Sequence, residues 1–441
     1  MKKLIIEQSD REFYTAHSGL SLVGLCVNKH TELCKKLSKH DNGKEKITSA
    51  EVIKSYLGLL CTGKSDYEAV ENMRGDDYFK VALGIKNVPS AARLRQRFDK
   101  QASNFERVIS EYLVDPISDI GAPITPLDTG HVPLDIDVFT LDNSKTKKEG
   151  VSRTYQGFDG YSPIAGYLGQ EGWCVGIELR KGSQHSQENF IPFLKKAIEN
   201  SRKLTTRPLL VRLDSAHDSI DTLVTLRESK KVSFIVKWNP RRSDVQKWKE
   251  KAFKEGRVVK PRVGKKVAYL SVRKRRFYNG KAHFFTLVIR VTERTITSGG
   301  QMMLFPDVEL EGWWTSLELP EEQIIELYKG HAVCEQYHSE FKTDLDIERL
   351  PSGKFATNAL ILSLAAFAYN ILRIIGQFGL MGWESPVRHK AKRRRIKTVI
   401  QELMHLAARL IKTAHRLKLR FSRHCPGYRA FEALYYRLLP T

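Results

Sequence analysis

Apolar residues recur at helical spacing in the first part of the chain, to about residue 125. Residues 50–61 place their apolar side chains on one helical face, and Ser49 is a candidate N-cap for this helix. Asp66 and Ser90 stand in front of two further helical segments, the second of which is rich in arginine. This region is predicted either as a helix-turn-helix-like DNA-binding module or as an ordinary helical domain, and the sequence leaves both open.

The pattern changes to alternation near residue 130, where Val132, Leu134, Ile136 and Val138 alternate with polar residues as on a half-buried strand. Further strands are predicted at 161–168, 173–179, 208–214 and 232–238, and helices at 187–200 and 220–229. This order matches that of an RNase H-like sheet, in which three strands are followed by a helix, a strand, a helix and a strand. The predicted fold class is therefore α/β, with an RNase H-like catalytic core, a β-rich insertion, and helical N-terminal and C-terminal regions.

After residue 239, strand-like runs alternate with basic loops, and helices are predicted again at 321–343, 356–378 and 396–419. The chain is thereby divided into five regions. They are a helical, DNA-binding region (1–125), the first part of the core (126–239), the basic β-rich insertion (240–318), the second part of the core with a helix carrying an acid (319–380), and basic C-terminal helices (381–441).

Charge indicates the class of partner. The formal net charge is +23, and residues 230–276 alone carry +15 while residues 381–441 carry +12, so the rest of the chain is slightly acidic. Two dense positive blocks favour a polyanion such as nucleic acid. A membrane partner is not predicted, because the longest apolar run, residues 359–372, is too short to span a bilayer. The six cysteines show no Cys-x-x-Cys spacing, which fits a cytoplasmic protein and argues against structural zinc.

Three acidic residues occupy positions that an α/β sheet could bring together. Asp137 lies on the first alternating strand, with Asp135 on the same face two residues earlier, and Asp214 ends the apolar strand 208–214. Glu335 lies on the predicted helix 321–343. Convergent carboxylates are what two-metal phosphodiester chemistry requires, and Mg²⁺ prefers such oxygen ligands. Each acid alone also has a plain interpretation, as a solvated strand residue, a helix N-cap or part of a solvated helix face.

The helix that carries Glu335 has a distinctive spacing. Tyr328-x-x-His331-x-x-x-Glu335-x-x-x-x-x-x-Lys342 places four polar residues on one stripe of a regular helix. This motif resembles the Tyr-x-x-Arg-x-x-x-Glu-x-x-x-x-x-x-Lys signature of DDE-type transposases of bacterial insertion sequences. Other segments resemble the same family: the first-aspartate strand at 134–137, a glycine-and-histidine turn at 180–186, the second-aspartate strand at 211–215, and a later helix motif at 368–370.

The resemblance implies a catalytic, metal-binding triad of Asp137, Asp214 and Glu335, holding two Mg²⁺ ions for which Mn²⁺ can substitute. It further implies that Tyr328 and Lys342 contact DNA near the cleaved phosphate. His331 replaces the signature arginine; a histidine is mostly neutral at pH 7 and cannot make a bidentate phosphate contact, which leaves a single hydrogen bond to DNA phosphate as its possible contact. The implied reaction is nicking of double-stranded DNA at terminal inverted repeats and attack by the 3′-hydroxyl on target DNA, by a homodimer on DNA. A hairpin route is left open.

Cations inside the two basic blocks are the predicted DNA contacts, namely Arg273, Lys274, Arg275 and Arg276 in the insertion and Arg393, Arg394 and Arg395 near the C-terminus. Trp313 and Trp314 are interpreted either as stackers for an unpaired base or as packing residues. Three other functions stay open: a non-catalytic DNA-binding protein of transposase ancestry, a nuclease of the same sheet class without strand transfer, and, more distantly, an RNA-binding protein.

Overall fold

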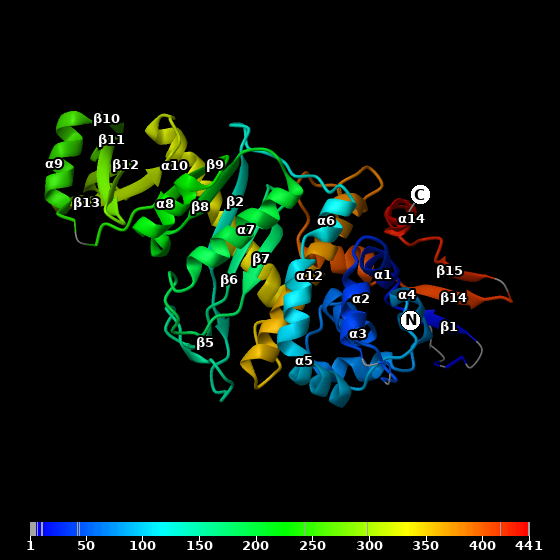
Figure 1. Ribbon diagram of the computed structural model, residues 1–441. Helices are drawn as coiled ribbons and strands as arrows, with labels where there is room; N and C mark the ends of the chain where they lie inside the picture. Colours follow the sequence, from blue (N-terminus) through cyan, green and yellow to red (C-terminus); the bar gives the residue numbers. More distant parts are fainter. Residues whose placement is uncertain are drawn as a thin grey trace.

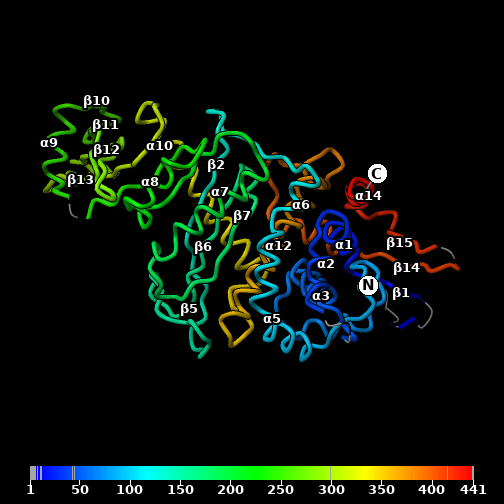
Figure 2. The backbone as a smooth tube through the Cα atoms, viewed as in Figure 1, coloured from blue at the N-terminus to red at the C-terminus, as the bar shows by residue number. Residues whose placement is uncertain are grey.

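The computed structural model describes residues 6, 8–9, 12–41, 43, 45–241, 243–297, 299–414 and 416–439. Figure 1 shows a lobe of long strands at one end, a central sheet with helices, and a helical region at the other end. The N-terminal and C-terminal segments both lie in that helical region, away from the lobe of strands (Figure 2). The fold is thus mixed α/β, with one large sheet as its main scaffold.

The large sheet has nine strands in the order β10-β11-β12-β13-β9-β8-β2-β6-β7. In its middle, β2 pairs in parallel with β8, and β8 in parallel with β9, whereas β6 and β7 are antiparallel neighbours on the other side. The continuous apolar run Leu209–Leu213 forms a fully buried strand, as expected for parallel strands covered on both faces. These five strands are β2 (Val132–Val138), β6 (Ile164–Leu168), β7 (Trp173–Glu178), β8 (Leu209–Leu213) and β9 (Val232–Lys237).

Helices predicted beside these strands are present with shifted ends. α7 spans Phe190–Leu204 and α8 spans Ile220–Glu228, between the strands that they connect. Two short strands, β3 (Leu141–Asp142) and β4 (Ser152–Arg153), pair with β5 (Asp159–Tyr161) in a small separate sheet after β2. The loop between β4 and β5 contacts the end of β2 that carries Asp137, where the Tyr155 hydroxyl donates to the carbonyl of Val138.

The β-rich insertion extends the central sheet, because β13 pairs antiparallel with β9. We call residues 245–315 the β lobe. An Asn279-Gly280 turn, with positive φ at both residues, joins the strand 265–278 to the strand 281–296 and explains why the chain reverses there. Trp313 and Trp314 are each only 2% exposed, so they are packing residues and not free stackers. The lobe consists of α9 (Val245–Glu255), β10 (Arg257–Arg262), β11 (Lys265–Tyr278), β12 (Lys281–Ile296) and β13 (Met302–Thr315).

The helical region is organised around α12 (Phe355–Gly379), which contacts α3, α5 and β7. α12 is long and apolar enough to cross a membrane, but 94% of its most apolar window is buried inside the protein. The N-cap of α3 is Thr48 and not the predicted Ser49, and Thr48 forms a capping box with Glu51. Ser90 caps α5 by accepting the Arg93 N–H. The side chain of Asp66 forms no capping hydrogen bond. The helices are α1 (Leu20–Lys29), α2 (Leu33–Leu37), α3 (Ser49–Cys61), α4 (Asp77–Leu83), α5 (Ala91–Glu111) and α6 (Asp115–Asp119).

The predicted helix 396–419 is wrong beyond residue 404. α13 (Ile396–Val399) and a π-helical turn (Ile400–Met404) are followed by strands β14 (Ala408–Lys412) and β15 (Leu417–Phe421). β1 (Phe13–Thr15), near the N-terminus, pairs with β14 to complete a three-stranded sheet. The alternation of leucines with basic residues after residue 408 favours strands, and β14 and β15 pair with each other over five residues. Of the predicted C-terminal helices, α14 (Tyr428–Leu438) also forms.

Candidate active site

Asp137 and Asp214 lie at the same edge of the central sheet. β2 and β8 are parallel neighbours in which Ile136 pairs with Leu213, so the next residue on each strand is an aspartate. Both acids therefore stand at the carboxyl ends of adjacent parallel strands, the edge at which open α/β sheets bind ligands. Of the proposed triad, these two residues are brought together by the strand register itself.

The two carboxylates influence each other. Burial and, to a smaller extent, the negative charge of Asp214 together raise the pKa of Asp137 to about 7, against the opposing effect of His331. Burial also raises the pKa of Asp214, although its side chain is 40% exposed. The Asp137 carboxylate accepts the Val138 N–H at 2.8 Å, and the Asp214 carboxylate accepts the Ala216 N–H at 3.2 Å. Both donors are neutral backbone N–H groups, so the two carboxylates keep their negative charge for binding a cation.

Asp135, two residues before Asp137 on the same strand, forms an ion pair with Arg212. Arg212, opposite Asp135 in the parallel register, donates from Nε and Nη2 to the two carboxylate oxygens of Asp135, each at 2.6 Å. Burial alone would raise the pKa of Asp135, but the charge of Arg212 and the bonds from Arg212 and His331 hold this pKa below its usual value. Asp135 is therefore a buried structural anion, and it does not join Asp137 as a free ligand.

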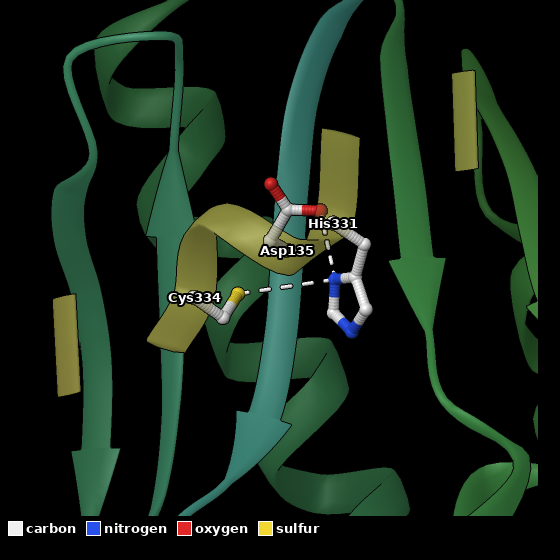
Figure 3. A group of neighbouring side chains, drawn as sticks. All are labelled: Asp135, His331 and Cys334. Atoms are coloured by element: carbon white, nitrogen blue, oxygen red, sulfur yellow. Dashed lines mark hydrogen bonds and ion pairs between the residues drawn. The ribbon is translucent and has the colours of Figure 1, made fainter. Parts of the chain in front are cut away.

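His331, at the position of the family's arginine, contacts this buried anion. Its Nδ1 lies 3.1 Å from Asp135 Oδ1 (Figure 3). Burial would lower the pKa of His331, but the hydrogen bond to Asp135 and the charges of Asp135 and Asp137 outweigh burial and raise this pKa. The raised pKa favours the protonated ring, in contrast to the mostly neutral histidine expected from the sequence. Among the described residues, the buried Nε2 of His331 has no hydrogen-bond partner.

Asp135, His331 and Cys334 offer three ligand atoms within 4.8 Å of one another, the spacing of a metal site (Figure 3). Two observations argue against that use. Arg212 already occupies both oxygens of Asp135, and burial together with the charge of Asp135 raises the pKa of the Cys334 thiol well above its usual range. A metal-bound cysteine must be a thiolate, so this cluster is better explained as support for His331.

The predicted helix 321–343 is helical throughout but changes type along its length, and this changes the position of Glu335 relative to a regular α-helix. α10 (Glu321–Lys329) ends in a 3₁₀ turn at Gly330–Val333, after which α11 covers Cys334–Ser339 and a π turn covers Glu340–Asp344. Arg212 donates from Nη1 to the carbonyl of Leu327 at 2.6 Å, and a side chain at Gly330 would clash with the same guanidinium. The change in helix type thus lies next to Arg212.

The change in helix type separates the residues of the predicted polar stripe. His331 is buried, whereas Glu335 is exposed on α11, which packs against β2, the strand of Asp137. Lys342 lies in the π turn and its Nζ is 3.8 Å from Glu348 Oε2. Changing from α to 3₁₀ geometry alters the number of residues per turn, so a regular helical wheel no longer applies. The structure joins His331 to the aspartates and leaves Glu335 and Lys342 outside their contacts.

Two tyrosines lie beside the aspartate pair. Burial raises the pKa of Tyr328, and the charges of Asp214 and Asp137 raise it further, so the tyrosine of the signature is near both acids. Tyr155 was not predicted from the sequence. Its hydroxyl donates to the carbonyl of Val138 at 3.3 Å, its pKa is raised to about 12 by burial and by the two aspartates, and its side chain is 67% exposed. No local pattern marks it, since it lies in the loop between β4 and β5.

The four predicted DNA-binding cations of the insertion lie on β11 and alternate between its two sides. Arg273 and Arg275 are exposed, and each packs over a phenylalanine ring, at 5.2 and 5.1 Å from the centroid. Lys274 and Arg276 are half-buried and lie over Trp248 and Trp314, at 4.7 and 5.5 Å. Only the first pair is freely presented to solvent, because side chains alternate along a strand.

The three arginines near the C-terminus have different surroundings. Arg394 is buried and donates to the carbonyls of Leu380, Val387 and His389, so it is not available to a phosphate. Arg393 pairs with the buried carboxylate of Glu340 at 2.9 Å and covers the ring of Tyr337. Arg395 binds Asp344 at 2.9 Å and is the one of the three whose side chain is about half exposed, at 49%.

Comparison with known proteins identifies the family of this chain. The sequence pattern of the family described as Transposase DDE domain group 1 matches residues 14–441. A comparison with curated proteins gave no match. Among solved structures, the chain is similar to the cryo-EM structure of a piggyBac transposase synaptic complex with hairpin DNA, at 11% identity and a TM-score of 0.45, over 87% of this chain and 79% of that chain. Since the family pattern covers nearly its whole length, the chain belongs to the group 1 DDE transposase domain family.

Proposed function

We propose that this transposase cuts the ends of a mobile DNA element and joins them to target DNA, at a site formed by Asp137, Asp214 and Glu335. The observation that carries the proposal is the placement of Asp137 beside Asp214 at the carboxyl ends of adjacent parallel strands. The strand order β7-β6-β2-β8-β9, with β6 alone reversed among them, supports an RNase H-like core around this pair.

The residues fit divalent metal ions. Two partly buried carboxylates, which among the described residues form no ion pair with an arginine or lysine, are a hard oxygen donor set of the kind that Mg²⁺ or Mn²⁺ prefers. Asp137 and Asp214 would hold the ions, with Glu335 added from α11. When bound, such ions activate a hydroxyl nucleophile and stabilise the leaving oxygen of a phosphodiester.

The remaining residues of the site act on the DNA. Asp135 and Arg212 fix the position of His331 beside the aspartates, and the raised pKa of His331 favours a proton on its ring. A protonated His331 can donate one charge-assisted hydrogen bond to a phosphate, in place of the bidentate contact of an arginine. Tyr328 borders the same acids, and Arg273, Arg275 and Arg395 offer exposed positive charge for the duplex.

The proposal is tested with duplexes taken from the DNA that flanks the reading frame. The wild-type protein should nick them with Mg²⁺ or Mn²⁺ and not with EDTA, and Asp137→Asn, Asp214→Asn and Glu335→Gln should each lower nicking at least about 100-fold. Asp221→Asn, on the exposed start of α8, is a matched control that should keep normal activity. Full activity in the Asp137 and Asp214 variants would refute the assigned site.

A strand-transfer assay with a supercoiled target plasmid addresses the second half of the proposal. Joined products from pre-nicked ends are expected, and cross-linking on DNA should capture a homodimer, because two ends are joined in one event. Cleavage without joined products would identify a nuclease, and DNA binding without cleavage would identify a non-catalytic DNA-binding protein.

A further inference from the structure

The three-stranded sheet of β1, β14 and β15, which we call the terminal sheet, has two different faces. Leu410, Leu419 and Phe421 share one face, and together with Tyr78 and Phe431 they line an apolar cavity against the helical region. This face is thus turned toward the protein. The alternation of side chains along a strand places the intervening residues on the opposite face.

That opposite face carries positive charge in an unfavourable arrangement. Arg409 on β14 is directly opposite Arg420 on β15, and Lys418 pairs with Ile411 one step along the same face. Tyr14 on β1, 60% exposed, lies across from Arg409 on its other side. Like charges directly opposite each other destabilise a pair of strands, and an anion over this face relieves that repulsion.

The chain supplies little negative charge to this face. No acidic residue occurs between Glu402 and Glu432 in the sequence. Glu12 pairs with Arg409 at 2.5 Å. Within the part of the chain that the structure describes, Lys418 and Arg420 form no ion pair, and both are exposed. The terminal sheet therefore presents two unneutralised cations beside a tyrosine, on a surface built from both ends of the chain.

We propose that the outer face of the terminal sheet binds the sugar-phosphate backbone of double-stranded DNA, with Lys418 and Arg420 as the principal contacts and Tyr14 beside them. This inference rests on the proposed function. Phosphates neutralise opposed cations, and a two-stranded β-ribbon is narrow enough to enter a major groove. A membrane surface fits less well, because the apolar face of the sheet is turned inward. The sheet lies at the end of the molecule away from the β lobe (Figure 1), so the two surfaces contact different stretches of DNA.

Fluorescence anisotropy with the full-length protein in EDTA tests the inference without catalysis. The probes are a duplex from the DNA flanking the reading frame and a random-sequence duplex of equal length. Lys418→Gln/Arg420→Gln should weaken binding to both roughly 10-fold at physiological salt, and the salt slope should fall by about two, since each phosphate contact contributes about 0.9. The control Lys195→Gln/Lys196→Gln removes two exposed cations from α7 and should change neither quantity.

The outcomes separate this inference from the proposed function. Normal binding and an unchanged salt slope in the terminal-sheet variant would overturn the inference alone, whereas a wild-type protein that binds neither duplex would overturn both. Arg420→Lys keeps the charge and should retain most of the affinity. Without DNA, the double variant should unfold at the same temperature as the wild type or higher, because the opposed charges are removed. A weaker affinity caused only by lost thermal stability would count against the DNA contact.

Discussion

Arg212 and Asp135 form a bidentate ion pair between adjacent parallel strands, with both N–O distances at 2.6 Å. The remaining guanidinium nitrogen, Nη1, reaches the carbonyl of Leu327 at the end of α10. One buried arginine thus links the strand of Asp137, the strand of Asp214 and the helix that leads to Glu335. This connection holds the three elements of the candidate active site together.

Arg212→Met should be strongly destabilising, because it leaves the Asp135 carboxylate buried without its principal partner. Removing one member of a buried ion pair typically costs about 3–5 kcal/mol. The measurement is chemical denaturation followed by far-UV circular dichroism, at neutral pH. Asp135→Asn/Arg212→Met, which removes both charges, should recover a substantial part of the loss. Equal losses in the single and double variants would show that the charge pair is not the cause.

Gly330→Ala should also destabilise the protein, since the added Cβ would clash with the guanidinium of Arg212. Crowding of this kind in a packed region costs typically about 1–3 kcal/mol. Gly353→Ala is the matched control, because a Cβ at Gly353 meets no atom within 4 Å. Thermal unfolding of both variants beside the wild type measures the difference. Equal melting temperatures for the two variants would argue against close contact between Arg212 and this turn.

Tyr155→Ala should weaken productive DNA binding, because it removes an exposed ring next to Asp137 and Asp214. Stacking of a base on an aromatic side chain contributes about 1–3 kcal/mol, which corresponds to a loss of roughly 5- to 150-fold in affinity. Tyr155→Phe keeps the ring and should retain most of the affinity. Affinity for single-stranded and nicked duplex probes, measured in EDTA, distinguishes the two variants. If the phenylalanine variant is as weak as the alanine variant, the hydroxyl and not the ring is important.

His338 should make the protein sensitive to mild acid. Its ring is buried and stacked on Phe139 at 4.4 Å, and burial lowers the pKa of His338 to about 3. An unfolded histidine has a pKa of about 6.5, so the unfolded state binds the proton first and stability falls as the pH drops below that value. Between pH 7.5 and 5.5 this one residue should cost about 1.4 kcal/mol.

The contribution of His338 is measured by comparing unfolding free energies at the two pH values in wild type and His338→Phe. The variant should lose about that part of the pH dependence, while His424→Gln, a change at an exposed histidine, should leave the dependence as in the wild type. An unaltered pH dependence in His338→Phe would show that this ring does not stay neutral on folding.

The local sequence was sufficient to predict the part of the fold that holds the aspartates. The alternation at 132–138 and the apolar run at 208–214 predicted the strands β2 and β8. The prediction that β2 is half-buried was wrong, because its residues 132–136 are buried on both faces of the sheet. The resemblance to DDE transposases is confirmed for the family as a whole. Strand ends are set by the same pattern, so Asp137 and Asp214 could be proposed before their register was known.

Tertiary structure decided what depends on a distant partner. The helix before Glu335 changes to a 3₁₀ turn next to the point where Arg212, more than a hundred residues earlier, contacts it, and no helical periodicity contains that information. His331 is buried, and its ring nitrogen forms a hydrogen bond with the buried carboxylate of Asp135. Residues 408–412 and 417–421 form strands that pair with each other, and β1, near the other end of the chain, adds a third strand beside β14. Local pattern fixes which segments can be helix or strand, whereas contacts between remote segments determine where such an element bends, ends or changes type.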